Sequence, residues 1–247
     1  MSRVFSAYEL NHLKNNGFKD IDTDSIGDSP VEYVTGHAEF RDLDFLVNPS
    51  TLIPRLESEK IVDLALQFIS QENISHPAIA DVGTGSGCLG ISLAVSLSKK
   101  QIPYTIYLSD ISEEALKIAG QNADNLLSSR VNLFFQTSSL MTNYPKIRFD
   151  VILANLPYIP SANISTLDSS VKDFEPVSAL DGGPDGTHFI NLLLQEIPDY
   201  LNSRGLAIFE INDTHAIEDF HIPNKFKAEI KNDTNDVPRF LLVNPNQ

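Results

Sequence analysis

The chain has 247 residues, of which 42% are hydrophobic, and it carries a formal net charge of -15 at pH 7. Its length fits one large domain or a domain with a small appendage, and its acidic balance, with a pI near 4.6, argues against a surface that follows nucleic-acid phosphates. A single cysteine, Cys88, excludes an internal disulfide, and no apolar targeting region or bilayer-length apolar run is found; these features predict a soluble cytoplasmic protein.

The first fifty residues predict two small elements ahead of the main domain. Residues 31–50 alternate loosely between apolar and polar side chains, which indicates a β-hairpin linker with candidate turns at Gly36 and Arg41–Asp42. Residues 51–247 then form the main domain, with Ser58 as a candidate N-cap of its first helix. Residues 1–30 predict a short helical segment followed by a polar linker, with the apolar positions of the helix at Tyr8, Leu10, Leu13 and Phe18.

From residue 77 onward, apolar runs of strand length alternate with helical patterns. This alternation predicts an α/β fold with a parallel sheet covered by helices on both faces. The expected strands are 78–82, 104–109, 131–135, 149–154, 206–211, 226–230 and 239–243, and the expected helices are 88–97, 113–127, 187–201 and 216–220.

Residues 81–87 read Asp-Val-Gly-Thr-Gly-Ser-Gly and stand between an expected strand and an expected helix. Glycines at such a turn let the backbone approach a ligand closely, and free N–H groups at a helix start favour an anionic group. A dinucleotide-binding fingerprint would need Gly or Ala at position 88, where this chain has Cys88. The turn therefore predicts a cofactor site that differs from the dinucleotide type.

Asp110 closes the next expected strand, 23 residues after Gly87. A carboxylate in this position can accept hydrogen bonds from the hydroxyl groups of a ribose. The alternative is a structural role at the start of a helix that Ser112 caps.

An apolar run, 149–154, ends at Asn155 and is followed by Leu156, Pro157 and Tyr158. The proline ends the strand, so Asn155 is expected at the carboxyl edge of the sheet, where ligands bind in open α/β folds. Its amide and the Tyr158 ring can together hold a planar group that bears an NH2. A strand end punctuated by prolines is the structural alternative.

Several segments resemble known methyltransferase motifs. Residues 81–87 resemble the first motif of S-adenosylmethionine-dependent methyltransferases of the seven-stranded class, and residues 155–158 resemble the Asn-Pro-Pro-Tyr motif of enzymes that methylate adenine N6 or glutamine N5. The matches to the peptide chain release factor glutamine N5-methyltransferases run in order from about residue 30 to residue 211. The matching segments include Tyr33-Val34-Thr35-Gly36, Pro54-Arg55, Glu175-Pro176 and Gly182-Gly183. Of these, the Pro-Arg and Glu-Pro segments are not general features of the methyltransferase fold.

The resemblance implies a Rossmann-like seven-stranded sheet, S-adenosylmethionine as cofactor, and as partner a peptide chain release factor methylated in its Gly-Gly-Gln loop. It implies that Asn155, Leu156, Pro157 and Tyr158 act in catalysis and, with Arg55 and Glu57, bind the substrate. No metal is expected, because the six histidines show no ligand spacing. The expected cofactor-binding residues are Asp81, Gly83, Thr84, Gly85, Ser86, Gly87, Asp110, Leu140 and Asn155.

The chain also departs from the family pattern. Leu56 and Leu156 stand where proline is usual, Ser139 where an acidic residue is usual, and Asn212 where glycine is usual. Family members carry a longer helical domain before the match. Two alternatives therefore stay open: an adenine N6-methyltransferase acting on ribosomal RNA or DNA, and a weakly active S-adenosylmethionine-binding module. Glu57 and the nearby Glu59 also have the alternative role of favouring a helix N-terminus.

Overall fold

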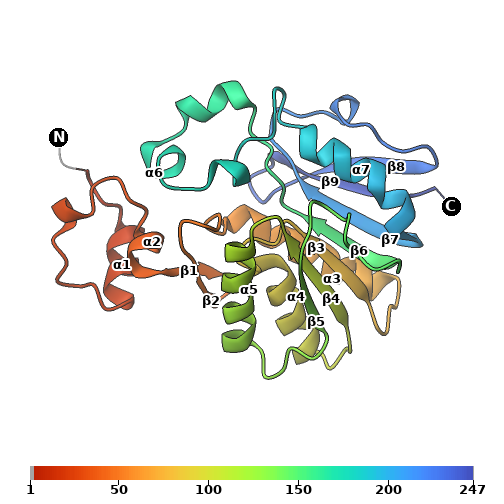
Figure 1. Cartoon of the computed structure of the whole chain (residues 1–247), viewed down its shortest axis with the longest axis horizontal. Helices are drawn as coiled ribbons and strands as arrows, with labels where there is room; N and C mark the ends of the chain where they lie inside the picture. Colours follow the sequence, from red (N-terminus) through yellow and green to blue (C-terminus); the bar gives the residue numbers. More distant parts are fainter. Residues whose placement is uncertain (1–2, 247) are drawn as a thin grey trace.

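The computed structural model describes residues 3–246, and its centre is a seven-stranded sheet in the order β5-β4-β3-β6-β7-β9-β8 (Figure 1). The first five of these strands are parallel, and β9 runs antiparallel to both of its neighbours. The expected seven-stranded α/β fold is confirmed. The strands are β3 (Ala78–Val82), β4 (Thr105–Asp110), β5 (Leu133–Thr137), β6 (Phe149–Ala154), β7 (Leu201–Glu210), β8 (Phe226–Asn232) and β9 (Pro238–Pro245).

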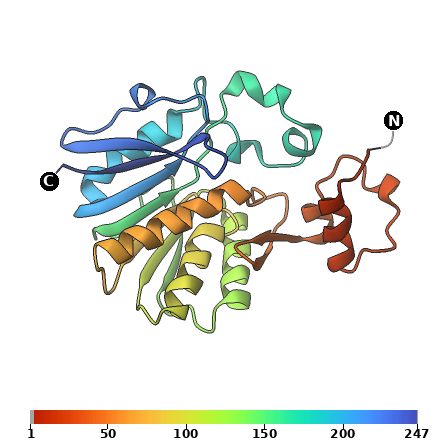
Figure 2. The same ribbon diagram turned by 180° about the vertical axis from the view of Figure 1, so that it is seen from behind.

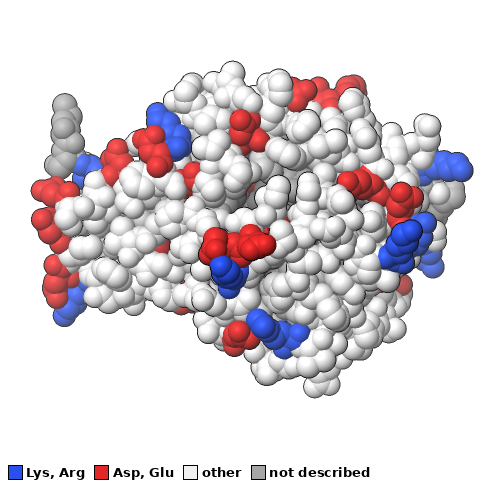
Figure 3. Space-filling view, viewed as in Figure 1, with Lys and Arg blue, Asp and Glu red and all other residues white. Residues whose placement is uncertain are grey.

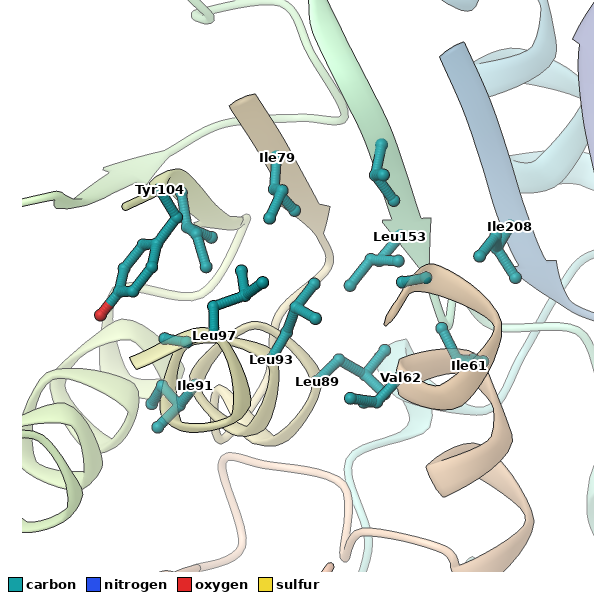
Figure 4. Packing of buried hydrophobic residues seen from close by; sticks show 14 of the residues in the cluster. Ile61, Val62, Ile79, Leu89, Ile91, Leu93, Leu97, Tyr104, Leu153 and Ile208 are labelled. Atoms are coloured by element: carbon teal, nitrogen blue, oxygen red, sulfur yellow. The ribbon is translucent and has the colours of Figure 1, made fainter. Parts of the chain in front are cut away.

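Helices cover both faces of the sheet (Figures 1 and 2). On one face lie α3 (Glu59–Gln71), α4 (Cys88–Lys99) and α5 (Glu113–Leu126), and on the other lies α7 (His188–Tyr200). Figure 4 shows how Leu89, Leu93 and Leu97, one helical turn apart on α4, pack against strand residues that include Ile79 and Leu153. Each fully buried side chain of this kind contributes about 1.5 to 3 kcal/mol, so this layer fixes where the strand ends lie.

Most strand boundaries lie within two residues of the predictions, and two elements differ more. β7 begins at Leu201, not at residue 206, because Leu201 already pairs with Phe149 ahead of an irregularity in the β6–β7 register. The sequence did not indicate this part of the strand, because residues 202–204 are polar and two of them are exposed. Residues 216–220 contain only a short 3-10 turn, Ile217–Asp219, in place of the expected helix.

The N-terminal lobe is a small folded unit built from α1 (Ala7–Asn15), a 3-10 turn and α2 (Val31–Thr35). Leu13, Ile26 and Val31 form its buried cluster, so the polar segment from residue 20 folds back on α1, and the prediction of a linker there is wrong. The expected boundary at residue 30 also cuts through this cluster. Tyr8 and Leu10 are 54% and 49% exposed, because α1 packs through the side that carries Leu13.

The predicted β-hairpin joins this lobe to the main domain, with β1 (His37–Phe40) paired to β2 (Leu43–Leu46). It is shorter than the predicted range 31–50, because residues 31–35 form α2 and Gly36 ends that helix. Arg41 and Asp42 form its two-residue turn with φ of 53° and 57°. The buried Asn122 on α5 anchors the hairpin: its Oδ1 accepts from the Leu46 N–H (2.7 Å), and its Nδ2 donates to the Leu46 carbonyl (3.0 Å) and the Ser86 carbonyl (2.8 Å). One side chain thus ties the hairpin to the glycine turn.

Within residues 3–246, no helix is long and apolar enough to cross a membrane. The same part of the chain contains no cluster of three or more His, Cys, Asp or Glu side chains arranged to hold a metal ion.

Candidate active site

A cavity of about 410 Å³ opens at the carboxyl ends of β3, β4 and β6, where the strand order reverses direction. This is the position at which open α/β sheets bind ligands, and the volume lies within the range of about 300 to 1,000 Å³ typical of small-molecule sites. Most of the residues predicted for the site meet here. Those that line the cavity are Arg55, Gly83, Thr84, Gly85, Ser86, Asp110, Leu140, Asn155, Leu156 and Pro157.

Four predicted site residues do not line the cavity: Asp81, Gly87, Tyr158 and Glu57. Asp81 is completely buried beneath the glycine turn, and Tyr158 turns its hydroxyl toward Glu210. Glu57 is exposed, because the 3-10 turn Leu56–Ser58 directs Ser58 inward and the preceding two side chains outward.

Asp81 supports the glycine turn from below. Its Oδ2 accepts hydrogen bonds from the Thr84 hydroxyl (2.6 Å) and the Gly90 N–H (2.9 Å). Burial raises the pKa of Asp81 to about 6, because a charged carboxylate loses its hydration there. The structure therefore gives Asp81 a role in holding the turn, which the sequence pattern did not separate from direct contact with a cofactor.

The glycine turn and the strand end that carries Asn155 contact each other directly. Gly83 has a φ of 71°, and a Cβ atom there would lie 2.9 Å from Cδ2 of Leu156. Only glycine allows this approach without strain. Leu156, which stands where the related family usually has proline, is thus buried against the turn.

Asp110 has the structural role considered for it, and it also lines the cavity. Its Oδ2 accepts from the Gly85 N–H (2.9 Å) and its Oδ1 from the Ser112 N–H (2.9 Å), while the Ser112 hydroxyl caps α5 by accepting from the Ala115 N–H (3.2 Å). Burial raises the pKa of Asp110 above its usual range. Because each carboxylate oxygen can accept more than one hydrogen bond, both oxygens keep capacity for a ligand in the cavity.

The Asn155 side chain is the end of a buried hydrogen-bonded chain. Its Nδ2 donates to the Ser58 Oγ (3.2 Å), and the Ser58 hydroxyl donates to Oε2 of Glu210 (2.6 Å). Tyr158 donates from its hydroxyl to the other oxygen, Oε1 (3.0 Å). Burial raises the pKa of Glu210. With Nδ2 engaged, the Oδ1 of Asn155 is left to accept a hydrogen bond from a ligand in the cavity.

Sequence reasoning missed both Ser58 and Glu210. Ser58 does occupy the N-cap position of α3, but its hydroxyl makes no capping bond. Glu210 carried one signal: like Asp110, it is a carboxylate at the end of an apolar run. Asn212, the nearby departure from the family pattern, only closes a local turn by accepting from the N–H of Thr214 (3.1 Å).

The loop that follows Asn155 is fixed by backbone hydrogen bonds to residues 180–183. The Ile159 N–H donates to the Leu180 carbonyl (3.0 Å), and the Gly182 N–H donates back to the Ile159 carbonyl (2.8 Å). A Cβ atom at Gly182 would lie 2.6 Å from the Pro157 carbonyl oxygen, so this position requires glycine. The backbone around Pro157 is thereby held in one conformation.

Arg55, which lines the cavity, forms an ion pair with Glu175, which is buried behind the cavity wall. These residues come from the Pro-Arg and Glu-Pro segments of the resemblance. Glu175 is buried and also accepts from the Ile53 N–H (3.2 Å), and burial raises its pKa despite the opposing effect of Arg55. The pair holds residues 51–55 against residues 175–179, and both segments line the cavity.

The match to a known family covers most of the residues that line this cavity, but not those between residues 50 and 58. The family model for a methyltransferase domain matches residues 75–238, more than half of the chain. The chain belongs to the methyltransferase domain family. A solved structure of a methyltransferase from Pyrococcus furiosus has a similar fold, with a TM-score of 0.55 and 18% sequence identity over 82% of this chain and 88% of that one.

Several curated relatives of this methyltransferase domain share one name. Proteins called release factor glutamine methyltransferase from Geobacter sulfurreducens and Moorella thermoacetica are each 39% identical to it over 183 residues. The aligned region is 74% of this chain and 60% and 62% of the two relatives. The chain thus matches about three fifths of the length of these relatives.

Membership of the methyltransferase domain family implies S-adenosylmethionine as the methyl donor. The residues present fit such a group. Ser86 lines the cavity and its buried Oγ has no hydrogen-bond partner among the residues described, and the Asp110 carboxylate lies in the same cavity wall. Leu140, also in the wall, has a φ of 50°, an uncommon conformation for a non-glycine residue and one that tends to occur at ligand sites.

Proposed function

We propose that this protein transfers a methyl group from S-adenosylmethionine to the side-chain amide nitrogen of a glutamine in a peptide chain release factor. The observation that carries the proposal is the orientation of Asn155, whose NH2 is bound to Ser58 so that its oxygen is left for an N–H of the target. The names of the curated relatives agree with this substrate. Such a partner works in the cytoplasm, and the net charge of -15 disfavours a nucleic acid as the substrate.

The proposed mechanism rests on positioning. Bound S-adenosylmethionine supplies a methyl group on a sulfonium, which is open to displacement by a nucleophile in line with the leaving sulfur. A carboxamide nitrogen is a poor nucleophile, because its lone pair is delocalised into the carbonyl. The Asn155 Oδ1 and the Leu156 carbonyl, which accepts no backbone hydrogen bond within residues 3–246, would each accept one N–H of the target amide. With both N–H groups held, the amide nitrogen is oriented for attack. After methylation, the nitrogen loses one of its two protons.

The same two acceptors would also hold the amino group of an adenine, so the substrate class needs a direct test. The full chain is incubated with labelled S-adenosylmethionine and, in separate reactions, with unmethylated release factor, ribosomal RNA and DNA, and the label is mapped by mass spectrometry. Label on a release-factor glutamine supports the proposal. Label on adenine, or cofactor binding without transfer to any of the three, overturns it.

A matched pair of variants shows whether the cavity performs the reaction. Asn155→Ala removes the acceptor in the cavity wall, whereas Ser92→Ala removes a buried hydroxyl on α4 that has no partner among residues 3–246. We expect the first to abolish most of the transfer and the second to retain it. Equal activity of the two variants would show that methyl transfer does not take place in this cavity.

A further inference from the structure

The buried carboxylate of Glu210 has no assigned part in the proposed reaction, although it lies two hydrogen bonds away from the cavity. We propose that Glu210 is a positioning residue that, through Ser58, fixes which end of the Asn155 amide faces the cavity. This inference rests on the proposed function only in requiring a target that donates an N–H.

The donors and acceptors of Glu210, Ser58 and Asn155 allow only one direction for the hydrogen bonds between them. An ionised carboxylate can only accept hydrogen bonds. The Ser58 hydroxyl has one proton, and at 2.6 Å it gives that proton to Oε2 of Glu210. Toward Asn155, Ser58 therefore presents only lone pairs, so only the NH2 of Asn155 can bond to it (3.2 Å). The amide oxygen must then be the end that is free to face the cavity.

Glu210 is itself held in place. Its Oε1 accepts from the Tyr158 hydroxyl (3.0 Å), so one carboxylate bridges two segments that line or support the site. Ser58 and Glu210 are each 1% exposed, which keeps water from supplying an alternative proton donor to Ser58. Burying a carboxylate in this way is costly unless its hydrogen bonds are made, so the arrangement is not a neutral filling of the core.

The direction of the hydrogen bonds between Asn155, Ser58 and Glu210 depends on the charge of Glu210. When Glu210 is protonated it becomes a donor to Ser58, the Ser58 hydroxyl turns its proton toward Asn155, and the amide rotates to offer its oxygen inward. The NH2 then faces the cavity and cannot accept an N–H. Burial and Glu57 favour the protonated form of Glu210, whereas the Tyr158 hydroxyl and Arg239 on β9 favour its ionised form. Burial raises the pKa of the Cys88 thiol, and Glu210 in turn adds to that shift.

A double-mutant cycle separates positioning from a general structural role. With release factor as substrate, we expect Ser58→Ala to lower kcat about tenfold, the effect of one lost hydrogen bond, with little change in the affinity for S-adenosylmethionine. In an Asn155→Ala background, Ser58→Ala should have no further effect on the residual rate, because nothing is left to position. Multiplicative losses in the double variant would overturn the proposal. Ser92→Ala is the control for removing a buried hydroxyl and should match the wild type.

A second measurement does not depend on the substrate. In the ¹⁵N-labelled full chain, the side-chain NH2 signals of Asn155 are identified by their loss in Asn155→Ala. We expect these signals to shift in Ser58→Ala, to stay in place in Ser92→Ala, and to titrate on acidification in the wild type but not in Glu210→Gln. If the NH2 signals of Asn155 change neither in Ser58→Ala nor with pH, the proposal is overturned. If the signals behave as expected but release factor is not methylated, the proposed function fails while the positioning role stands.

Discussion

The two sides of the cavity are held together over very different distances along the chain. On the cofactor side, Asp81 bonds to Thr84 three residues away, and Gly85 bonds to Asp110 across 25 residues. On the side of Asn155, the bond to Ser58 spans 97 residues and the bond from Ser58 to Glu210 spans 152. The cofactor turn is thus a local structure, whereas the substrate side exists only when several distant segments are assembled.

Acidic side chains are prominent on the surface of the N-terminal lobe. Figure 3 shows Asp and Glu side chains along the N-terminal lobe and few Lys and Arg side chains on this face of the molecule. Leu56 and Val177, near the mouth of the cavity, are 71% and 53% exposed.

The largest expected effect tests the substrate side. Asn155→Ala should lower kcat about thirtyfold, roughly 2 kcal/mol, because one hydrogen bond and the alignment of the target are lost together. Affinity for S-adenosylmethionine, measured by calorimetry, should change little. Full activity in this variant would remove Asn155 from the reaction.

The next effect tests the contact that closes the substrate side. Arg55→Ala should reduce the free energy of unfolding by about 1.5 kcal/mol, since it leaves the Glu175 carboxylate buried without its partner; the figure is set below that for fully buried pairs because Arg55 is partly exposed. Urea denaturation of this variant is compared with Glu57→Ala, an exposed residue of the same segment that should leave stability unchanged. Equal stability of the two variants would contradict a stabilising role for the ion pair.

On the cofactor side, Asp110→Ala should weaken S-adenosylmethionine binding about tenfold, roughly 1.4 kcal/mol, because it removes an acceptor from the cavity wall and frees the Gly85 N–H. At saturating cofactor, kcat should stay near that of the wild type. An unchanged dissociation constant in calorimetry would exclude Asp110 from the cofactor site.

The smallest effect concerns pH and Asp81. Its pKa is raised to about 6 in the folded protein, so the native state binds this proton more tightly than the unfolded chain does. The contribution of Asp81 to stability therefore falls as pH rises through about 6 and is constant above that range. Between pH 5 and pH 8, the stability of the wild type relative to Asp81→Asn should fall by about 1 kcal/mol. If urea titrations give a stability difference between the wild type and Asp81→Asn that does not depend on pH, the pKa of Asp81 is not raised in the folded protein.

The sequence predicted the parts of the molecule that depend on local order. Alternating apolar periods gave the strands and helices, and the glycine turn, Asp110 and Asn155 were each placed correctly at a strand end. The sequence did not predict the place of Ser58 and Glu210 in the site. Ser and Glu are common residue types, and nothing in the sequence around them indicates a contact across 152 residues. The buried cluster of the N-terminal lobe escaped for a related reason, since Ile26 lies alone within a polar segment.

The three hydrogen bonds of Asn122 have a mechanical consequence. Because one amide grips both backbone groups of Leu46 and the carbonyl of Ser86, the hairpin cannot slide past the glycine turn without breaking bonds in the interior of the protein. The hairpin, which carries the N-terminal lobe, is therefore tied to the glycine turn by hydrogen bonds in the interior of the protein.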